Sequence, residues 1–192
     1  VYCSDQAHSS IDKAAVTLGI GLDNLRRIPT DDAYRMRIDL LEEAISSDKA
    51  AGRRPIALVG TLGTTSTTSV APLPDLARIA KREDLWLHVD GAYALAAGIC
   101  PEYRTLMAGV EAADSIVTNP HKWLFVPVDC SVLFVRDPDL LRRAFSIVPD
   151  YLTTTESGVT NLMDYGVQLG RRFRALKLWM VLRGFGVQGL QE

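Results

Sequence analysis

Short apolar runs alternate along the chain with longer segments in which apolar residues recur every three or four positions. The short runs predict β-strands or extended segments at residues 1–4, 25–29, 56–62, 86–90, 115–118 and 130–136. The longer periodic segments predict helices at residues 9–19, 39–51, 73–83, 101–109, 138–145 and 169–182. This alternation predicts an α/β fold, in which a mainly parallel mixed sheet has helices on both of its faces.

The polar segments between these elements differ in composition. Residues 63–72 are rich in threonine, and residues 149–161 are polar and interrupted, so both segments predict loops. Four basic residues gather near the last predicted helix, namely Arg171, Arg172, Arg174 and Lys177. Because that helix also has an apolar side, we expect this basic cluster to lie on a solvated or salt-bridged face and to take no part in catalysis.

The overall composition narrows the class of protein. Hydrophobic residues make up 47% of the 192 residues and charged residues 23%, which excludes a disordered, collagen-like or disulfide-stapled chain. The formal net charge is −2 with both signs spread along the chain, so neither nucleic acid nor an anionic membrane is an expected partner. Cys3, Cys100 and Cys130 are irregularly spaced, which predicts reduced thiols in a cytoplasmic protein.

The apolar runs and the first residues of the chain indicate whether it contains a membrane span or a secretory leader. No run approaches the roughly eighteen apolar residues that a membrane span needs, and no charged-then-apolar leader precedes a cleavage site. We therefore expect neither a membrane segment nor a secretory leader. The first residue is Val1 rather than Met, so we expect the natural N-terminus to lie further upstream.

Candidate functional residues follow the predicted strands, because ligands of open α/β sheets bind beyond the carboxyl ends of the strands. Asp90 closes an apolar strand, where an ionised carboxylate needs a cation or a strong donor nearby. A turn or cap aspartate remains an equally open interpretation of this residue. Lys122 stands just past the next predicted strand, where a partly desolvated amine can form a Schiff base. A lysine in a surface loop is the alternative.

Asp90 and Lys122 together are more specific than either residue alone. An enzyme that uses pyridoxal phosphate (PLP) needs a lysine that binds the cofactor's aldehyde and a carboxylate that keeps the pyridine nitrogen protonated. His121, beside the lysine, is a candidate donor to a phosphate group.

Two further features follow other predicted strands. His8 lies between a strand and a helix, where its ring could stack on a planar cofactor and carry a proton, or could simply pack or cap the helix. Thr61, Thr64 and Thr65 could donate hydrogen bonds to an oxygen-rich ligand, although threonine-rich loops are often only turns. The stretch GTLGTT lacks the spacing of a nucleotide-binding P-loop.

Several segments carry a resemblance to a known family over essentially the whole chain. They are SDQAHSSIDKAA (4–15), ALVGTLGTTSTTS (57–69), LWLHVDGAYA (85–94), NPHKWLFVPVDCS (119–131) and LGRRFRALKLW (169–179). Occurring in this order, they resemble the PLP-dependent group II decarboxylases, and among these the aromatic-L-amino-acid decarboxylases.

The resemblance implies a fold and an assembly. Members of this family have the fold-type I PLP architecture, with a large domain, a smaller C-terminal domain and a homodimer whose active site lies at the interface. Residues 1–176 would then belong to the large PLP-binding domain, and residues 177–192 would lead into the small domain. Because family members are roughly two to three times as long, we expect the chain to be the central part of a larger enzyme.

The resemblance also implies roles for individual residues. Lys122 would carry the cofactor, Asp90 would pair with the pyridinium nitrogen, and His8 and Ala92 would pack on opposite faces of the ring. Thr61, Asn119 and His121 would hold the cofactor's oxygen and phosphate groups. Tyr151, in the predicted loop at residues 149–161, would protonate the substrate carbon after carbon dioxide leaves. No metal ion is expected.

These implied roles lead to one expected function and two alternatives. We expect decarboxylation of aromatic L-amino acids to amines, because relatives that produce aldehydes tend to replace the loop tyrosine with Phe or the stacking histidine with Asn. This chain has Tyr151 and His8 at those places. An aromatic aldehyde synthase on the same fold is one alternative, and a catalytically silent, dimer-forming fragment is the other.

Overall fold

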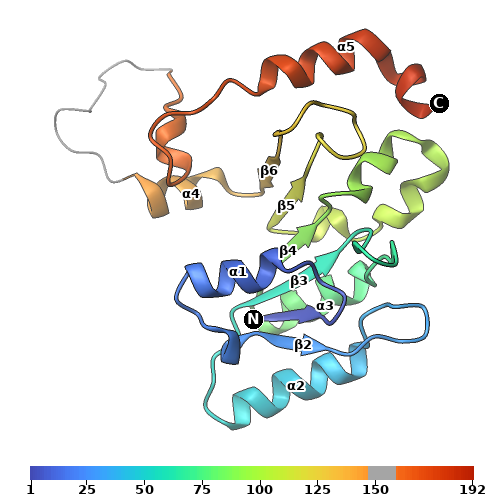
Figure 1. The fold of residues 1–192 in the computed structure, drawn as a ribbon. Helices are drawn as coiled ribbons and strands as arrows, with labels where there is room; N and C mark the ends of the chain where they lie inside the picture. Colours follow the sequence, from blue (N-terminus) through green and yellow to red (C-terminus); the bar gives the residue numbers. More distant parts are fainter. Residues whose placement is uncertain (147–158) are drawn as a thin grey trace.

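The computed structural model describes residues 1–146 and 159–192 (Figure 1). Tyr151 and most of the predicted loop at residues 149–161 lie outside the described residues. Among the residues that the structure does describe, no helix combines the length and the apolar character that a membrane span would need.

A six-stranded sheet with the order β2-β1-β3-β4-β5-β6 forms the centre of the molecule. Its strands are β1 (Tyr2–Ser4), β2 (Arg26–Ile28), β3 (Ala57–Thr61), β4 (Trp86–Asp90), β5 (Ser115–Thr118) and β6 (Val132–Val135). All pairings are parallel except that of β6, which runs antiparallel to β5. The mainly parallel mixed sheet predicted from the sequence is therefore confirmed.

Helices connect the strands and cover the sheet. The α-helices are α1 (Ser10–Thr17), α2 (Ile38–Ala50), α3 (Leu73–Glu83), α4 (Pro138–Phe145) and α5 (Ala175–Gln191). Short 3₁₀ helices lie at η1 (Leu22–Asn24), η2 (Ala94–Ile99), η3 (Pro101–Met107), η4 (Val110–Ala112) and η6 (Leu162–Tyr165). In Figure 1, α1 lies over one face of the sheet, whereas α2 and α3 lie on the other side.

The main core lies between the sheet and the helices α2 and α3. Leu58 of β3 and Leu87 of β4 are buried there against Leu76 and Ile79 of α3. Burying each of these side chains contributes about 2 kcal/mol to stability. On the other face, Val59 of β3 belongs to a smaller cluster against which α1 packs.

The alternation of side chains along β4 determines where the polar residues point. Leu87 and Val89 are fully buried in the main core. Because successive residues of a strand face opposite sides, His88 and Asp90 project from the other face of the sheet. This strand therefore contributes apolar residues to the main core and polar residues to the opposite face of the sheet.

The C-terminal helix begins later than predicted. We expected it at residues 169–182, but α5 runs from Ala175 to Gln191. Arg172 and Arg174 precede the helix and form ion pairs with Asp129, at 3.2 Å and 2.8 Å. The ion pairs agree with the salt-bridged face expected for the basic cluster, but Arg172 and Arg174 precede the helix instead of lying on it.

The segment predicted as a helix at residues 101–109 is also different in the structure. It forms the 3₁₀ helix η3, and a further 3₁₀ helix, η2, precedes it without having been predicted. Gly98 and Pro101 interrupt this stretch, and both residues disfavour a continuous α-helix.

Candidate active site

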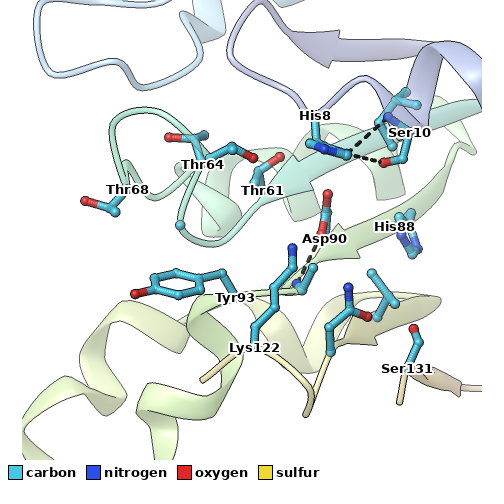
Figure 2. Close-up of a pocket in the computed structure, with 16 residues that line it drawn as sticks. His8, Ser10, Thr61, Thr64, Thr68, His88, Asp90, Tyr93, Lys122 and Ser131 are labelled. Carbon is cyan, nitrogen blue, oxygen red and sulfur yellow. Dashed lines mark hydrogen bonds between the residues drawn. The ribbon is translucent and has the colours of Figure 1, made fainter. Parts of the chain in front are cut away.

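A cavity of about 740 Å³ opens at the carboxyl ends of the parallel strands. His8, Thr61, Asp90, Ala92, Asn119 and Lys122 all line it, although they come from segments far apart in the sequence. Figure 2 shows the labelled side chains around this space. The structure thus brings together most of the site residues expected from the sequence.

Asp90 is the last residue of β4 and only 7% of its surface is exposed. The backbone N–H of Ala92 donates a hydrogen bond of 3.1 Å to its Oδ1 atom, so the turn after the strand orients the carboxylate. A carboxylate this buried is stable only beside donors or a positive charge. In Figure 2 it faces the space into which Lys122 also points.

Lys122 lies in the loop after β5, and backbone hydrogen bonds define the loop's shape. The N–H of Lys122 donates to the carbonyl of Asn119 at 2.8 Å, and the N–H of Val126 donates to the carbonyl of Pro120 at 3.1 Å. The N–H of Asn119 donates in turn to the carbonyl of Ala92 at 3.1 Å. These bonds connect the lysine loop to the turn that follows Asp90.

His121 is part of the same loop, but it is not one of the described residues that line the cavity. Its Nδ1 atom lies 2.7 Å from the carbonyl oxygen of Cys130 and 3.0 Å from the backbone nitrogen of Cys130. The ring therefore joins the two ends of the loop that contains Lys122. A role in binding phosphate remains a prediction for this residue.

His8 lies above the cavity in Figure 2, across from Asp90. Its Nδ1 atom accepts a hydrogen bond of 3.2 Å from the backbone N–H of Ser10 and lies 3.0 Å from the Ser10 hydroxyl. This contact at the start of α1 fixes the ring beside the cavity. This contact supports the capping interpretation, and the stacking role remains a prediction.

The threonine-rich segment forms an ordered turn at the edge of the cavity. Thr64 is buried, its hydroxyl lies 2.6 Å from that of Thr67, and it accepts a hydrogen bond from the N–H of Ser69. Gly63 has a φ of 75°, and a Cβ atom there would lie 2.7 Å from that of Ala94. The turn therefore requires glycine at this position, and it places threonine hydroxyls at the cavity.

Asn119 provides an unusual polar atom in the site. Its side-chain Oδ1 is buried and has no hydrogen-bond partner among the described residues. Buried polar atoms are nearly always satisfied, so this oxygen is suited to a donor on a bound molecule. Together with Asp90, Lys122 and the threonine hydroxyls, it makes a set of groups that fits a cofactor with a protonated ring nitrogen, an aldehyde and several oxygens.

Sequence reasoning missed two features of the site. His88 lines the cavity beside Asp90, and the alternation within WLHVD could have revealed that both residues share one face. Tyr93 also lines the cavity, and its ring stacks on that of Trp123 with centroids 4.6 Å apart and planes 11° apart. The stacked rings connect the turn after Asp90 to the residue that follows Lys122.

Comparisons with known proteins agree with this geometry. The model of the pyridoxal-dependent decarboxylase conserved domain matches residues 1–192. Tyrosine decarboxylase 4 of Petroselinum crispum is 48% identical over 197 residues, which cover 100% of this chain and 39% of the relative. Phenylacetaldehyde synthase of Arabidopsis thaliana is 47% identical over 197 residues, with coverages of 100% and 40%.

A solved structure shows the same arrangement of the chain. The Oryza sativa TDC crystallised with PLP and tryptamine superimposes with a TM-score of 0.94 at 45% identity, over 99% of this chain and 40% of that one. The chain thus spans about two fifths of the length of the relatives that it matches. Its fold is the fold-type I α/β architecture of PLP-dependent decarboxylases.

Proposed function

Because the chain belongs to the pyridoxal-dependent decarboxylase family, we propose that the protein containing it decarboxylates aromatic L-amino acids to aromatic amines and carbon dioxide. PLP is the cofactor of this family. The observation that carries the proposal is the convergence of a buried carboxylate, Asp90, and an amine, Lys122, on one cavity at the carboxyl ends of the strands. This pair is what a PLP enzyme requires.

The site residues expected from the family have distinct roles in this proposal. Asp90 would hold the pyridine nitrogen, Lys122 would bind the aldehyde carbon, and His8 and Ala92 would enclose the ring. Thr61, Asn119 and His121 would hold the oxygen and phosphate groups. When bound, PLP supplies a protonated ring that accepts the electron pair of the bond broken as carbon dioxide leaves.

The chain's own groups would direct the reaction. The negative charge of Asp90 would keep the ring nitrogen protonated, and the amine of Lys122 would hold the cofactor's aldehyde carbon when no substrate is bound. Tyr151, outside the described residues, would deliver a proton to the substrate's Cα. Proton delivery at that carbon, rather than reaction there with dioxygen, yields an amine.

The names of the relatives support an aromatic substrate, since they include a tyrosine decarboxylase and a TDC solved with tryptamine. Product analysis of the full-length protein with Trp, Tyr, Phe and dihydroxyphenylalanine tests this part of the proposal. Release of an aromatic amine with an equal amount of carbon dioxide is the expected result. Absence of amine from all four substrates would contradict it.

A second candidate function is aromatic aldehyde synthesis on the same fold. It is favoured by the 47% identity to phenylacetaldehyde synthase. We prefer the decarboxylase because Tyr151 and His8 are both present. Product analysis distinguishes the two functions. Formation of aldehyde, ammonia and hydrogen peroxide in place of amine would support the aldehyde synthase.

A catalytically silent, dimer-forming chain is the remaining alternative. Visible absorbance after addition of PLP distinguishes it, because a silent chain that cannot hold the cofactor develops no band from bound PLP. A band without any amine product would indicate a binder that does not catalyse. For the active protein we expect both the band and the product.

We also propose the domain division and the assembly expected from the family. Residues 1–176 would belong to the large domain, residues 177–192 would lead into the small domain, and the full-length protein would form a homodimer. Trp179 and Phe185 of α5 are more than half exposed, which is costly for large apolar side chains unless another surface covers them.

The three free cysteines fit a cytoplasmic location.

A further inference from the structure

Much of the loop at residues 119–131, which contains Lys122, is exposed. Phe125 and Val128 are 70% and 79% exposed, so these large apolar side chains do not hold the loop by packing. A segment with little buried apolar surface opens at a low free-energy cost. The position of Lys122 in the cavity therefore depends strongly on the polar contacts of the loop.

Contacts near the start of the loop hold its first half. The N–H of Lys122 donates to the carbonyl of Asn119 at 2.8 Å, and the ring of Trp123 stacks on that of Tyr93. Neither of these contacts reaches residues 127–131, so the second half of the loop needs support of its own.

Asp129 joins the second half of the loop to the segment before α5. Arg174 donates to Asp129 Oδ2 from Nε at 3.1 Å and from Nη2 at 2.8 Å, and Arg172 Nη1 donates to Oδ1 at 3.2 Å. Both carboxylate oxygens are thus bound, and the rigid guanidinium of Arg174 fixes the direction of the carboxylate. The hydrogen bonds from Arg174 are the main cause that lowers the pKa of Asp129 to about 2, so the carboxylate is charged at neutral pH.

A further hydrogen bond joins α5 itself to the same part of the loop. Lys177 Nζ donates to the carbonyl of Pro127 at 2.8 Å. In Figure 1, α5 accordingly lies beside the loop between β5 and β6. The start of the last helix and the arginines before it therefore act on two neighbouring positions of the loop.

The imidazole of His121 connects this anchored half to the lysine. Its Nδ1 atom contacts the backbone nitrogen and the carbonyl oxygen of Cys130, at 3.0 Å and 2.7 Å. Cys130 directly follows Asp129, and His121 directly precedes Lys122. A displacement of Asp129 is thus passed to the backbone next to the lysine.

We propose that Asp129 is a positioning residue, which the arginines before α5 hold in place so that the loop presents the amine of Lys122 to the aldehyde carbon of PLP. This inference rests on the proposed function. The amine nitrogen bonds to the aldehyde carbon, and the two amine hydrogens leave with the aldehyde oxygen as water. The arginines act on this step only through the loop, which agrees with their expected absence from the chemistry.

The test measures the affinity of the full-length protein for two probes, PLP and pyridoxine 5′-phosphate, which has an alcohol in place of the aldehyde and cannot bond to Lys122. Asp129→Asn keeps the shape of the side chain and removes the charge that pairs with the arginines. We expect the Kd for PLP to rise about fivefold, the effect of losing a partly exposed ion pair. The Kd for pyridoxine 5′-phosphate should stay the same, because this probe does not use the lysine.

Two further variants and a control accompany this measurement. Arg174→Gln breaks the same contact from the other side, so the double variant should lose no more PLP affinity than Asp129→Asn alone. Asp129→Glu keeps the carboxylate and should restore most of the affinity. Asp39→Asn is the matched control, because Asp39 is an exposed carboxylate paired with Arg37 on α2, and it should change neither affinity.

Each outcome bears on a different part of the argument. Equal losses of affinity for both probes in Asp129→Asn, or no loss for either, would overturn the positioning role and leave the proposed function intact. Failure of the unmodified protein to bind PLP would overturn the proposed function and this inference with it. A loss confined to PLP and reversed in Asp129→Glu supports the role. Thermal midpoints without cofactor report folding, and if Asp129→Asn does not fold, Arg174→Gln with the same two probes decides.

Discussion

Thr61 and Asp90 are paired across β3 and β4, and each is the last residue of its strand. The pairing places a hydroxyl and a carboxylate side by side in the lining of the cavity, and the N–H of Leu62 donates to the Asp90 carbonyl at 2.8 Å. Both strands are parallel and well buried, so this edge is rigid. A rigid edge is what an electrostatic partner of a cofactor needs.

The charge of Asp90 is the first property to test. Asp90→Asn preserves the shape of the side chain but removes its charge, so the ring nitrogen of PLP would no longer be held as a cation. We expect turnover of the full-length enzyme to fall by about a thousandfold or more while PLP is still detected in the protein. Steady-state amine production and cofactor absorbance measure the two effects.

Asp84→Asn is the control for the Asp90 variant. Asp84 is exposed at the end of α3 with a φ of 55°, a conformation that asparagine also adopts readily. Its turnover should match that of the unmodified enzyme. Near-normal turnover in Asp90→Asn would exclude the proposed role of the carboxylate.

A second carboxylate, Asp48, contributes to the pH dependence of stability. It accepts hydrogen bonds from the Tyr2 hydroxyl at 2.9 Å, from Arg26 Nη2 at 2.5 Å and from Arg53 Nη1 at 3.2 Å. The hydrogen bonds from Arg26 are the main cause that lowers its pKa to about 2 from an ordinary 3.8. The stabilisation is therefore complete above pH 3.8 and is lost as the pH falls through about 2.

Asp48→Asn should destabilise the full-length protein by about 2 kcal/mol at pH 7, because it removes the charge that accepts the buried hydrogen bond of Tyr2 and the partly buried hydrogen bonds of Arg26. The difference from the unmodified protein should shrink as the pH approaches 2. Chemical denaturation at pH 7 and pH 3 measures it, with Asp39→Asn, an exposed partner of Arg37, as control. A constant difference at both pH values would contradict the assignment.

Tyr151 determines the fate of the substrate carbon in our account. Tyr151→Phe removes the proposed proton donor, so dioxygen can react at that carbon instead. We expect the products to shift from amine toward aldehyde, ammonia and hydrogen peroxide, with matching consumption of dioxygen. Peroxide and dioxygen assays check this shift, and Tyr103→Phe, an exposed tyrosine of η3, is the control. Unchanged product ratios would remove Tyr151 from this role.

The hydrophobic pattern predicts the regular elements well. The bounds of α3, β4, β5 and α4 agree with the predicted ones. In each of these segments the apolar residues recur with a clear period, and the segment has a distinct end. The expected convergence of Asp90 and Lys122 follows from parallel strands alone, since their carboxyl ends meet at one edge.

Features set by contacts distant in the sequence could not be predicted in this way. Arg172 and Arg174, just before α5, form ion pairs with Asp129, a residue distant in the sequence, and no local pattern reveals these pairs. The contact of 2.8 Å between His88 Nδ1 and the hydroxyl oxygen of Ser115 joins two neighbouring strands, so it also could not be predicted from a local pattern.

The central claim is that Lys122 carries the cofactor, and one measurement tests it most directly. The full-length protein is incubated with PLP, reduced with borohydride, digested and analysed by mass spectrometry. We expect the cofactor to be attached to Lys122, and we expect Lys122→Ala to abolish the attachment. Attachment at another lysine, or an equal amount of attached cofactor in Lys122→Ala, would contradict the account.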